Sequence, residues 1–133
     1  MVTYLWIAAG SAIGGMARFW FGGLVDNRIE ANFPWGTILV NITGSFLIGF
    51  LAAINGAEGR ALLNTTAREF AMIGICGGYT TFSSFSLQTL YLARQGELFA
   101  AGWNIVLSVV CCLVAVWLGH FLETGLNEIR YPT

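Results

Sequence analysis

The sequence predicts an all-α membrane protein with four transmembrane helices. Of its 133 residues, 56% are hydrophobic and only 10% are charged, whereas a soluble domain carries about 25% charged residues. Four apolar stretches are each long enough for the roughly 20 residues that a spanning helix needs. Little chain remains for anything else, so we expect one transmembrane domain over residues 1–133 and no soluble catalytic module. Four short helices enclose little volume, and any pathway is therefore expected between the subunits of an oligomer.

The first predicted span covers about residues 4–24. Gly10 and Gly14 stand four residues apart in it, and small residues at this spacing let two helices approach closely. Arg18 lies toward the far end of the span. Its side chain either extends to the membrane surface or places a cation beside a vestibule that attracts anions.

The second span, about residues 36–54, carries a polar stripe. Thr37, Asn41 and Ser45 recur every four residues and so share one helix face. An unpaired carboxamide in hydrocarbon costs roughly 2–7 kcal/mol, so Asn41 is expected to face protein or water. It either joins two helices or lines a polar path.

The third span, about residues 70–93, is predicted to be broken in the middle of the membrane. Residues 74–86 contain a glycine pair, Gly77-Gly78, and then a run of hydroxyl side chains. Two adjacent glycines are a poor helix interior, and irregular backbone at bilayer depth is tolerated only inside protein or beside water. The freed carbonyls of such a break can hold a cation, and the hydroxyls beyond it can serve a polar path.

Two phenylalanines follow the glycines at helical spacing. Phe82 and Phe85 are three residues apart and share a helix face. Such a pair commonly packs against lipid or other helices. An aromatic ring also has a positive edge, and a ring turned edge-on to a narrow path attracts an anion without trapping it. Neutral donors such as Asn41, Ser83 and Ser84 replace part of the hydration shell of a small anion in this interpretation.

The fourth span, about residues 98–122, repeats the polar stripe with Asn104, Ser108 and Cys112. Ser108 offers a further hydroxyl donor. All three cysteines fall inside predicted spans, and none has metal-ligand spacing with His120, the only histidine. Neither a disulfide nor a zinc site is therefore expected.

Charge patterning bears on mechanism and on topology. No carboxylate falls at mid-depth in a predicted span, whereas proton-coupled carriers usually keep an ionisable residue there. Positive charge sets orientation, and the arginines divide about evenly between the two sides. Such a balance predicts subunits that insert both ways and pair as an antiparallel, dual-topology homodimer. With the N-terminus inside, the cytoplasmic arginines are Arg60, Arg68 and Arg130, and the opposite ones are Arg28, Arg94 and, if it extends outward, Arg18.

Three segments resemble the Fluc (CrcB) fluoride channels, bacterial proteins that let cytoplasmic fluoride leak out. They are residues 14–19 (GGMARF), 36–41 (GTILVN) and 77–86 (GGYTTFSSFS). The third is highly specific, and the resemblance extends over all four spans.

The resemblance implies a fluoride-selective channel in the bacterial inner membrane, which lowers intracellular fluoride by passive efflux. Two pores are implied at the interface of an antiparallel, dual-topology homodimer. Asn41 is implied to coordinate fluoride, and Phe82 and Phe85 to form an aromatic box. Gly77 and Thr80 are implied to lend backbone carbonyls to one structural Na+ at the dimer centre. The implied polar lining consists of Thr37, Ser83, Ser84 and Ser108.

Three positions depart from residues that some family members carry. Gln88 replaces a glutamate, Asn104 a tyrosine and Cys112 a hydroxyl side chain, and these changes bear on conduction rate and on the outer polar track. The alternative function is a small dual-topology exporter of organic cations, although the expected mid-membrane carboxylate is missing. A further alternative is a non-transporting subunit of a membrane assembly, but this function does not explain the polar stripes. An enzyme is disfavoured, because no nucleophile–base pair or metal-binding group falls at depth.

Overall fold

The structure, a computed structural model, describes residues 1–29, 32–56 and 63–130, with side chains described up to residue 125 except at 55 and 56. Within these ranges the chain is all-helical, which confirms the predicted fold class. Four helical stretches follow one another, the third of them divided into segments. They are α1 (Val2–Asp26); α2 (Trp35–Gly56); α3 (Thr65–Glu69), η1 (Phe70–Cys76), α4 (Gly77–Tyr79) and α5 (Phe82–Arg94); and α6 (Leu98–Arg130).

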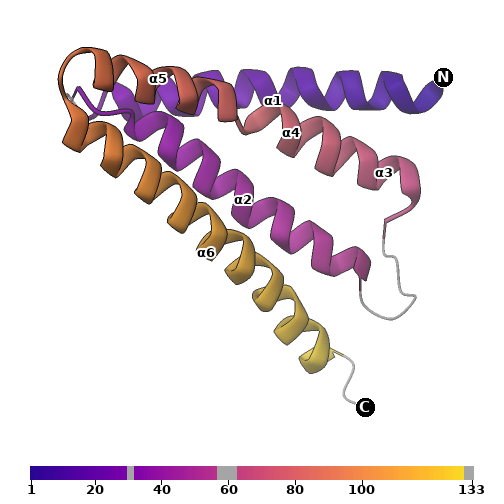
Figure 1. The fold of residues 1–133 in the computed structure, drawn as a ribbon. Coiled ribbons are helices and arrows are strands. Elements are labelled where there is room, and N and C mark those ends of the chain that lie inside the picture. Colours follow the sequence, from indigo (N-terminus) through magenta and orange to yellow (C-terminus); the bar gives the residue numbers. More distant parts are fainter. Residues whose placement is uncertain (30–31, 57–62, 131–133) are drawn as a thin grey trace.

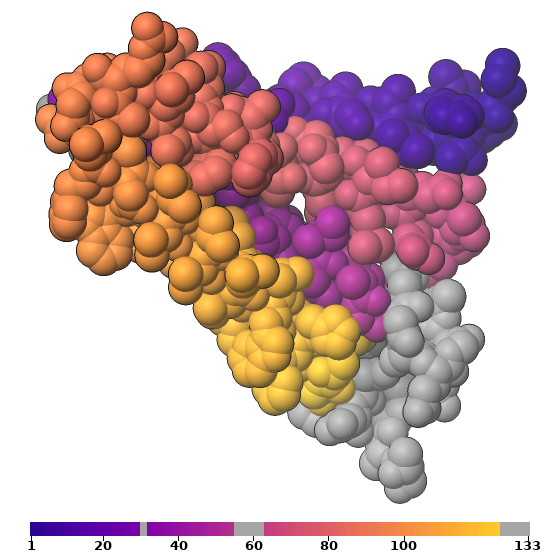
Figure 2. Space-filling model, viewed as in Figure 1, coloured from indigo at the N-terminus to yellow at the C-terminus, as the bar shows by residue number. Residues whose placement is uncertain are grey.

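The four stretches form two layers. In Figure 1, α1 lies beside α3, η1 and α4, while α2 and α6 run together in the second layer. The layers meet near the turn between α5 and α6, where the space-filling view shows them in contact (Figure 2), and they diverge toward the opposite ends of the helices. The third stretch thus passes from one layer toward the other along its length.

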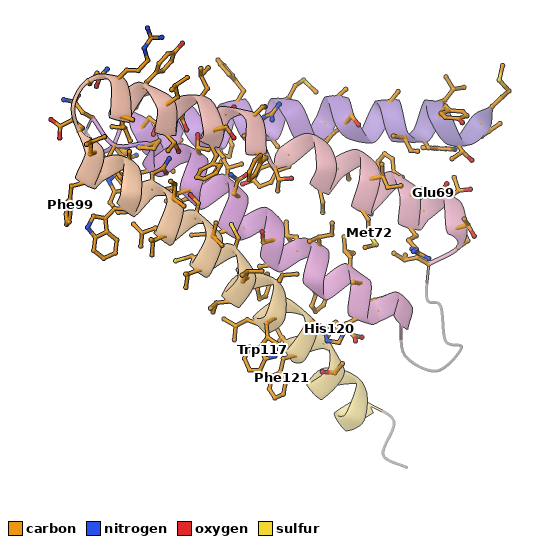
Figure 3. The ribbon with its side chains drawn as sticks, viewed as in Figure 1. Glu69, Met72, Phe99, Trp117, His120 and Phe121 are labelled. Atoms are coloured by element: carbon orange, nitrogen blue, oxygen red, sulfur yellow. The ribbon has the colours of Figure 1, made fainter. Side chains whose placement is uncertain are left out.

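The outer surface suits a lipid environment. Two helical segments, Trp35–Ile54 and Leu98–Gly125, are long and apolar enough to cross a membrane. Large apolar side chains are exposed along α6, where Trp117 and Phe121 stack with ring centroids 5.3 Å apart (Figure 3). Aromatic side chains of this kind are enriched at membrane interfaces. The chain is therefore a membrane protein, while the spans predicted over α1 and the third stretch stay predictions.

Glycines bring α1 into backbone contact with the third stretch. A Cβ atom on Gly10 would lie 2.7 Å from the Phe70 carbonyl oxygen, and one on Gly78 would lie 2.6 Å from the Ser11 carbonyl oxygen. Both glycines of the Gly77-Gly78 pair are helical, and the backbone becomes extended at Thr80 and Thr81, within residues 74–86. The physical reason is that Gly78 serves close helix packing, which a helical glycine allows at modest cost.

Local capping explains where the third stretch begins and ends. Its helix starts at Thr65, before the predicted residue 70, because the Asn64 side chain accepts a hydrogen bond from the Ala67 N–H at 2.8 Å. It ends at Arg94, and Gly96 follows with a φ of 86°. Glycine suits this position just past the helix end, since the left-handed conformation favours glycine.

Candidate functional site

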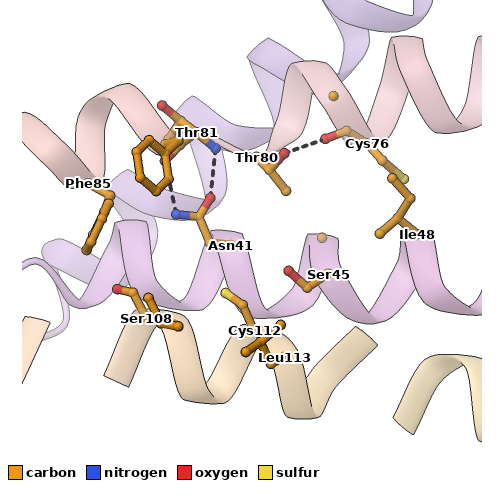
Figure 4. Close-up of a pocket in the computed structure, with 14 residues that line it drawn as sticks. Asn41, Ser45, Ile48, Cys76, Thr80, Thr81, Phe85, Ser108, Cys112 and Leu113 are labelled. Carbon is orange, nitrogen blue, oxygen red and sulfur yellow. Dashed lines mark hydrogen bonds between the residues drawn. The ribbon is translucent and has the colours of Figure 1, made fainter. Parts of the chain in front are cut away.

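Asn41 and Thr81 join α2 to an interruption between α4 and α5. Thr80 and Thr81 have extended backbone, with ψ angles of 157° and 111°, between the two helical segments. The Asn41 amide nitrogen donates to the Thr81 carbonyl at 3.0 Å, and the Thr81 N–H donates to the Asn41 side-chain oxygen at 2.7 Å (Figure 4). One side chain thereby satisfies a backbone donor and a backbone acceptor that helix interruption leaves unpaired.

Thr81 also caps the start of α5. Its hydroxyl oxygen accepts a hydrogen bond from the Ser84 N–H at 3.1 Å and lies 3.2 Å and 3.0 Å from the Ser83 and Ser84 hydroxyls. A threonine N-cap of this kind stabilises a helix by satisfying a donor of its first turn. In the single chain, Ser83 and Ser84 therefore belong to the hydroxyl cluster that begins α5.

The same bonds remove the helical donors of two backbone carbonyls. In a continuous helix, the N–H of Thr81 would bond to the Gly77 carbonyl and the N–H of Ser84 to the Thr80 carbonyl. The Thr81 N–H donates to Asn41 instead, and the Ser84 N–H donates to the Thr81 hydroxyl. The carbonyl oxygens of Gly77 and Thr80 thus lose their usual helical partners at the interruption.

Arg18 points toward this interruption. Its guanidinium Nη1 donates to the Thr80 carbonyl at 3.3 Å, and the side chain is partly buried. Of the two sequence-based interpretations, this placement favours a cation near the site over a side chain that extends to the membrane surface. In the predicted charge balance, Arg60 lies outside the described residues, as does the side chain of Arg130.

A cavity of about 370 Å³ lies beside the interruption, between α2, the third stretch and α6 (Figure 4). Its lining combines apolar side chains with hydroxyl, amide and thiol groups, and none of the lining side chains carries a formal charge at neutral pH. The lining residues are Asn41, Gly44, Ser45, Ile48, Cys76, Gly77, Thr80, Thr81, Phe82, Phe85, Ser108, Val109, Cys112 and Leu113.

Two aromatic rings border the cavity in different surroundings. The centroids of Phe82 and Phe85 are 5.1 Å apart, and their planes are inclined by 54°. Phe85 is 8% exposed, whereas Phe82 is 77% exposed although it lines the same cavity. The cavity therefore opens to the surface at Phe82, and Phe85 forms part of its inner wall.

The stripe predicted on the fourth span divides between two environments. Ser108 and Cys112 line the cavity from α6. Asn104 does not line it and is 1% exposed; its amide nitrogen donates to the Thr89 hydroxyl of α5 at 2.8 Å. The i, i+4, i+8 spacing thus identifies a common helix face but not how far along that face the cavity extends.

The cavity brings together most of the sequence-predicted site residues, from three of the four helical stretches. Thr37, Ser83 and Ser84 are not among its lining residues. The predicted residues that line it are Asn41, Gly77, Thr80, Phe82, Phe85 and Ser108.

Sequence reasoning missed the part played by Thr81. This residue accepts the Asn41 amide, caps α5 and is 7% exposed. A threonine three residues ahead of Ser84 at the start of an apolar helix is a recognisable N-cap signal. Tyr79 was missed as well: its hydroxyl lies 2.9 Å from the Thr43 hydroxyl and ties α4 to α2, and no sequence motif indicates that pair.

Side-chain metal ligands are not clustered in the part of the chain that the structure describes. No group of three or more His, Cys, Asp or Glu side chains that could hold a metal ion occurs there.

The fold and cavity define a small helical membrane protein with an uncharged polar site. A family profile described as "CrcB-like protein, Camphor Resistance (CrcB)" matches residues 5–120. The chain therefore belongs to the CrcB family.

Relatives are similar over nearly their whole length. The chain is 60% identical to a "Fluoride-specific ion channel FluC" of Methylocella silvestris, over 97% of this chain and 98% of the relative. It is 54% identical to a protein of the same name from Opitutus terrae, over 98% of each chain. A third such protein, from Rhodospirillum rubrum, is 52% identical over 96% of this chain and 98% of the relative.

Proposed function

We propose that the chain forms a fluoride-selective ion channel that gives passive efflux of cytoplasmic fluoride. The observation that carries this proposal is the chemistry of the cavity: neutral hydrogen-bond donors and a pair of aromatic rings, with no carboxylate in the lining. Membership of a family whose relatives are named fluoride-specific ion channels supports the same function. A small, strongly hydrated anion requires donors that replace its water but do not hold it permanently.

The Asn41 amide and the Ser108 hydroxyl are the proposed anion donors. Asn41 has two amide N–H groups, and one of them donates to the Thr81 carbonyl. The other is the group proposed to bind fluoride from the cavity. Phe82 and Phe85 are proposed to direct ring edges at the ion, where the aromatic quadrupole is positive. Ser83 and Ser84 are proposed for the polar lining as further neutral donors and by the family resemblance, and Thr37 by the resemblance.

The proposal includes an antiparallel, dual-topology homodimer with two pores at its interface. The exposure of Phe82 supports a partner, because the cavity that this ring borders is open in the single chain. The near balance of arginines supports insertion in both directions. With Arg18 directed inward, the count becomes three cytoplasmic arginines against two on the opposite side. This difference is still too small to favour one membrane orientation strongly.

A structural Na+ is proposed at the dimer centre, held by the Gly77 and Thr80 carbonyls of each subunit. Both carbonyls fit such an ion because they lack their usual helical donors. The Thr81 N–H donates to Asn41 instead of Gly77, and the Ser84 N–H donates to the Thr81 hydroxyl instead of Thr80. Carbonyl oxygens are neutral, hard ligands suited to a hard cation. The Thr80 oxygen also accepts a long hydrogen bond from Arg18, and a carbonyl has a second lone pair for a further partner. The ion would bind the two helix interruptions together.

The alternative functions gain no support from the described residues. An exporter of organic cations needs an acidic side chain to couple to protons, and none lines the cavity. The glycines that could hold an assembly subunit to other proteins are occupied within the chain, since Gly10 packs against Gly74.

Fluoride resistance in cells tests the proposal in its expected location, the bacterial inner membrane. The protein would be expressed in a bacterium that lacks its own fluoride export, and growth in millimolar fluoride would be scored. We expect growth to be restored. Failure to grow, with the protein shown to be in the membrane, would contradict the proposed function.

A further inference from the structure

Asn104 is the most completely buried polar residue described in the chain, and it joins α5 to α6. It is 1% exposed, and its amide nitrogen donates to the Thr89 hydroxyl at 2.8 Å. The Thr89 hydroxyl in turn donates to the Phe85 carbonyl at 2.8 Å. Asn104 thereby connects, through one hydroxyl, to the backbone of the aromatic residue on the inner wall of the cavity.

The direction of these bonds fixes the orientation of the Asn104 amide. A threonine hydroxyl has one proton, and Thr89 uses it on the Phe85 carbonyl. The Thr89 oxygen can therefore only accept, so the Asn104 nitrogen faces α5 and its oxygen faces Ser108. The Ser108 hydroxyl donates to this oxygen at 3.5 Å. Asn104 thus bonds directly to Ser108 and is linked to Phe85 through Thr89. Both Ser108 and Phe85 line the cavity, although Asn104 does not.

The bond from Ser108 to Asn104 is weak, and its weakness matters for an arriving ion. Hydroxyl hydrogen bonds are usually about 2.7–2.8 Å long, so a 3.5 Å contact holds the proton loosely. Without the Asn104 oxygen, a helical serine turns to the backbone carbonyl four residues earlier. Ser86 already does so, donating to the Phe82 carbonyl at 2.9 Å. A proton held in that stronger bond is harder for an anion to recruit.

We propose that Asn104 is a positioning residue for anion conduction. Its nitrogen fixes, through Thr89, the turn of α5 that carries Phe85. Its oxygen keeps the Ser108 proton loosely held and available to an anion in the cavity. The proposal rests on the proposed fluoride function, and it adds a buried residue that does not line the cavity.

The test compares variants that remove, or keep, the hydrogen-bonding groups that link Asn104 to Phe85 through Thr89. Asn104→Leu removes both amide groups, and Thr89→Val removes the hydroxyl at nearly constant volume. Thr89→Ser keeps the hydroxyl. Ser86→Ala is the matched control, because it removes a hydroxyl of the same helix that donates to a carbonyl four residues earlier but is not hydrogen-bonded to Asn104.

Fluoride efflux would be measured from liposomes that hold on average less than one channel each. The fraction of liposomes that lose fluoride then reports correctly assembled protein, and the rate of loss reports conduction per channel. A merely structural role would change the fraction and leave the rate unchanged.

We expect Asn104→Leu and Thr89→Val each to slow the rate by about tenfold, the scale of one lost hydrogen bond. The double variant should be no slower than the slower single one, because both changes break one chain of bonds. Thr89→Ser and Ser86→Ala should conduct like the unaltered protein. Unaltered rates in Asn104→Leu and Thr89→Val would overturn the positioning role. An absence of fluoride efflux from the unaltered protein would instead overturn the proposed function.

Discussion

The Asn41 side chain pairs with both backbone groups of Thr81, at 3.0 Å and 2.7 Å, and so holds α2 to the interruption between α4 and α5. This single pairing has two consequences. It frees the Gly77 carbonyl from its helical donor, and it leaves one Asn41 N–H available to the cavity. The residue proposed to bind fluoride thus also shapes the backbone around it.

Asn41→Asp is predicted to abolish fluoride conduction. The carboxylate keeps the acceptor for the Thr81 N–H but loses the donor to its carbonyl. It also places a fixed negative charge at the cavity, where low dielectric strengthens repulsion of an anion. Efflux from liposomes measures the effect. Asn64→Asp is the control, because Asn64 caps α3, away from the cavity lining, and aspartate and asparagine are comparable N-caps. Undiminished efflux in Asn41→Asp would place Asn41 off the conduction path.

Phe82→Ile and Phe85→Ile are predicted to slow fluoride efflux strongly while the dimer still assembles. Each change removes a ring edge with a modest change in volume. Because Phe85 is 8% exposed and Phe82 is 77% exposed, only Phe85→Ile should also lower the stability of the single chain, by about 1 kcal/mol. Phe99→Ile provides a control at an exposed ring that does not line the cavity. Normal efflux in both cavity variants would remove the aromatic-box account.

Gly14→Ala is predicted to destabilise the protein by about 1–3 kcal/mol. The added Cβ would meet the Ile75 carbonyl and lie 2.8 Å from the Tyr79 nitrogen, so α1 and the third stretch would have to separate. Gly15→Ala is the matched control, because a Cβ there meets nothing within 4 Å. Thermal unfolding in detergent measures both. Equal melting temperatures for the two variants would contradict the close packing at Gly14.

Dual topology predicts that a position on one side of the membrane is found on both sides in a population of subunits. Glu97, exposed in the turn between α5 and α6, would be changed to cysteine and treated with a membrane-impermeant thiol reagent in intact cells. About half of the subunits should react, and the rest only after the membrane is opened. Complete reaction, or none, in intact cells would indicate a single orientation. The unaltered chain, whose cysteines lie on the predicted spans, gives the background level of reaction with the reagent.

The sequence predicted the components of the site better than their arrangement. Asn41 and Ser108 could be recognised because a neutral polar residue on an apolar helix is costly unless it has a partner. The spacing of Phe82 and Phe85 placed both rings on one face. Composition and the length of the apolar stretches were enough for the helical fold, because stretches of about 20 apolar residues pair their backbone groups within one helix.

The sequence limited the interruption to residues 74–86 but could not indicate Thr80 and Thr81 within them, because tertiary contacts decide the exact position. Gly77-Gly78 has the weaker helix propensity, yet the helix continues through it and ends before Thr80. The close approach of α1 uses Gly78, and the Asn41 side chain pairs with Thr81 from 40 residues away. Propensity is a weak prior that tertiary context overrides. The placement of Asn104 outside the cavity depends in the same way on its contact with Thr89.

The most direct test of fluoride conduction is ion efflux from liposomes that hold the purified protein, with fluoride and chloride compared and no proton gradient applied. The proposed function predicts rapid passive loss of fluoride and negligible loss of chloride. No fluoride loss from liposomes that contain the intact dimer would contradict it and would direct the next experiment to transport of a cationic dye.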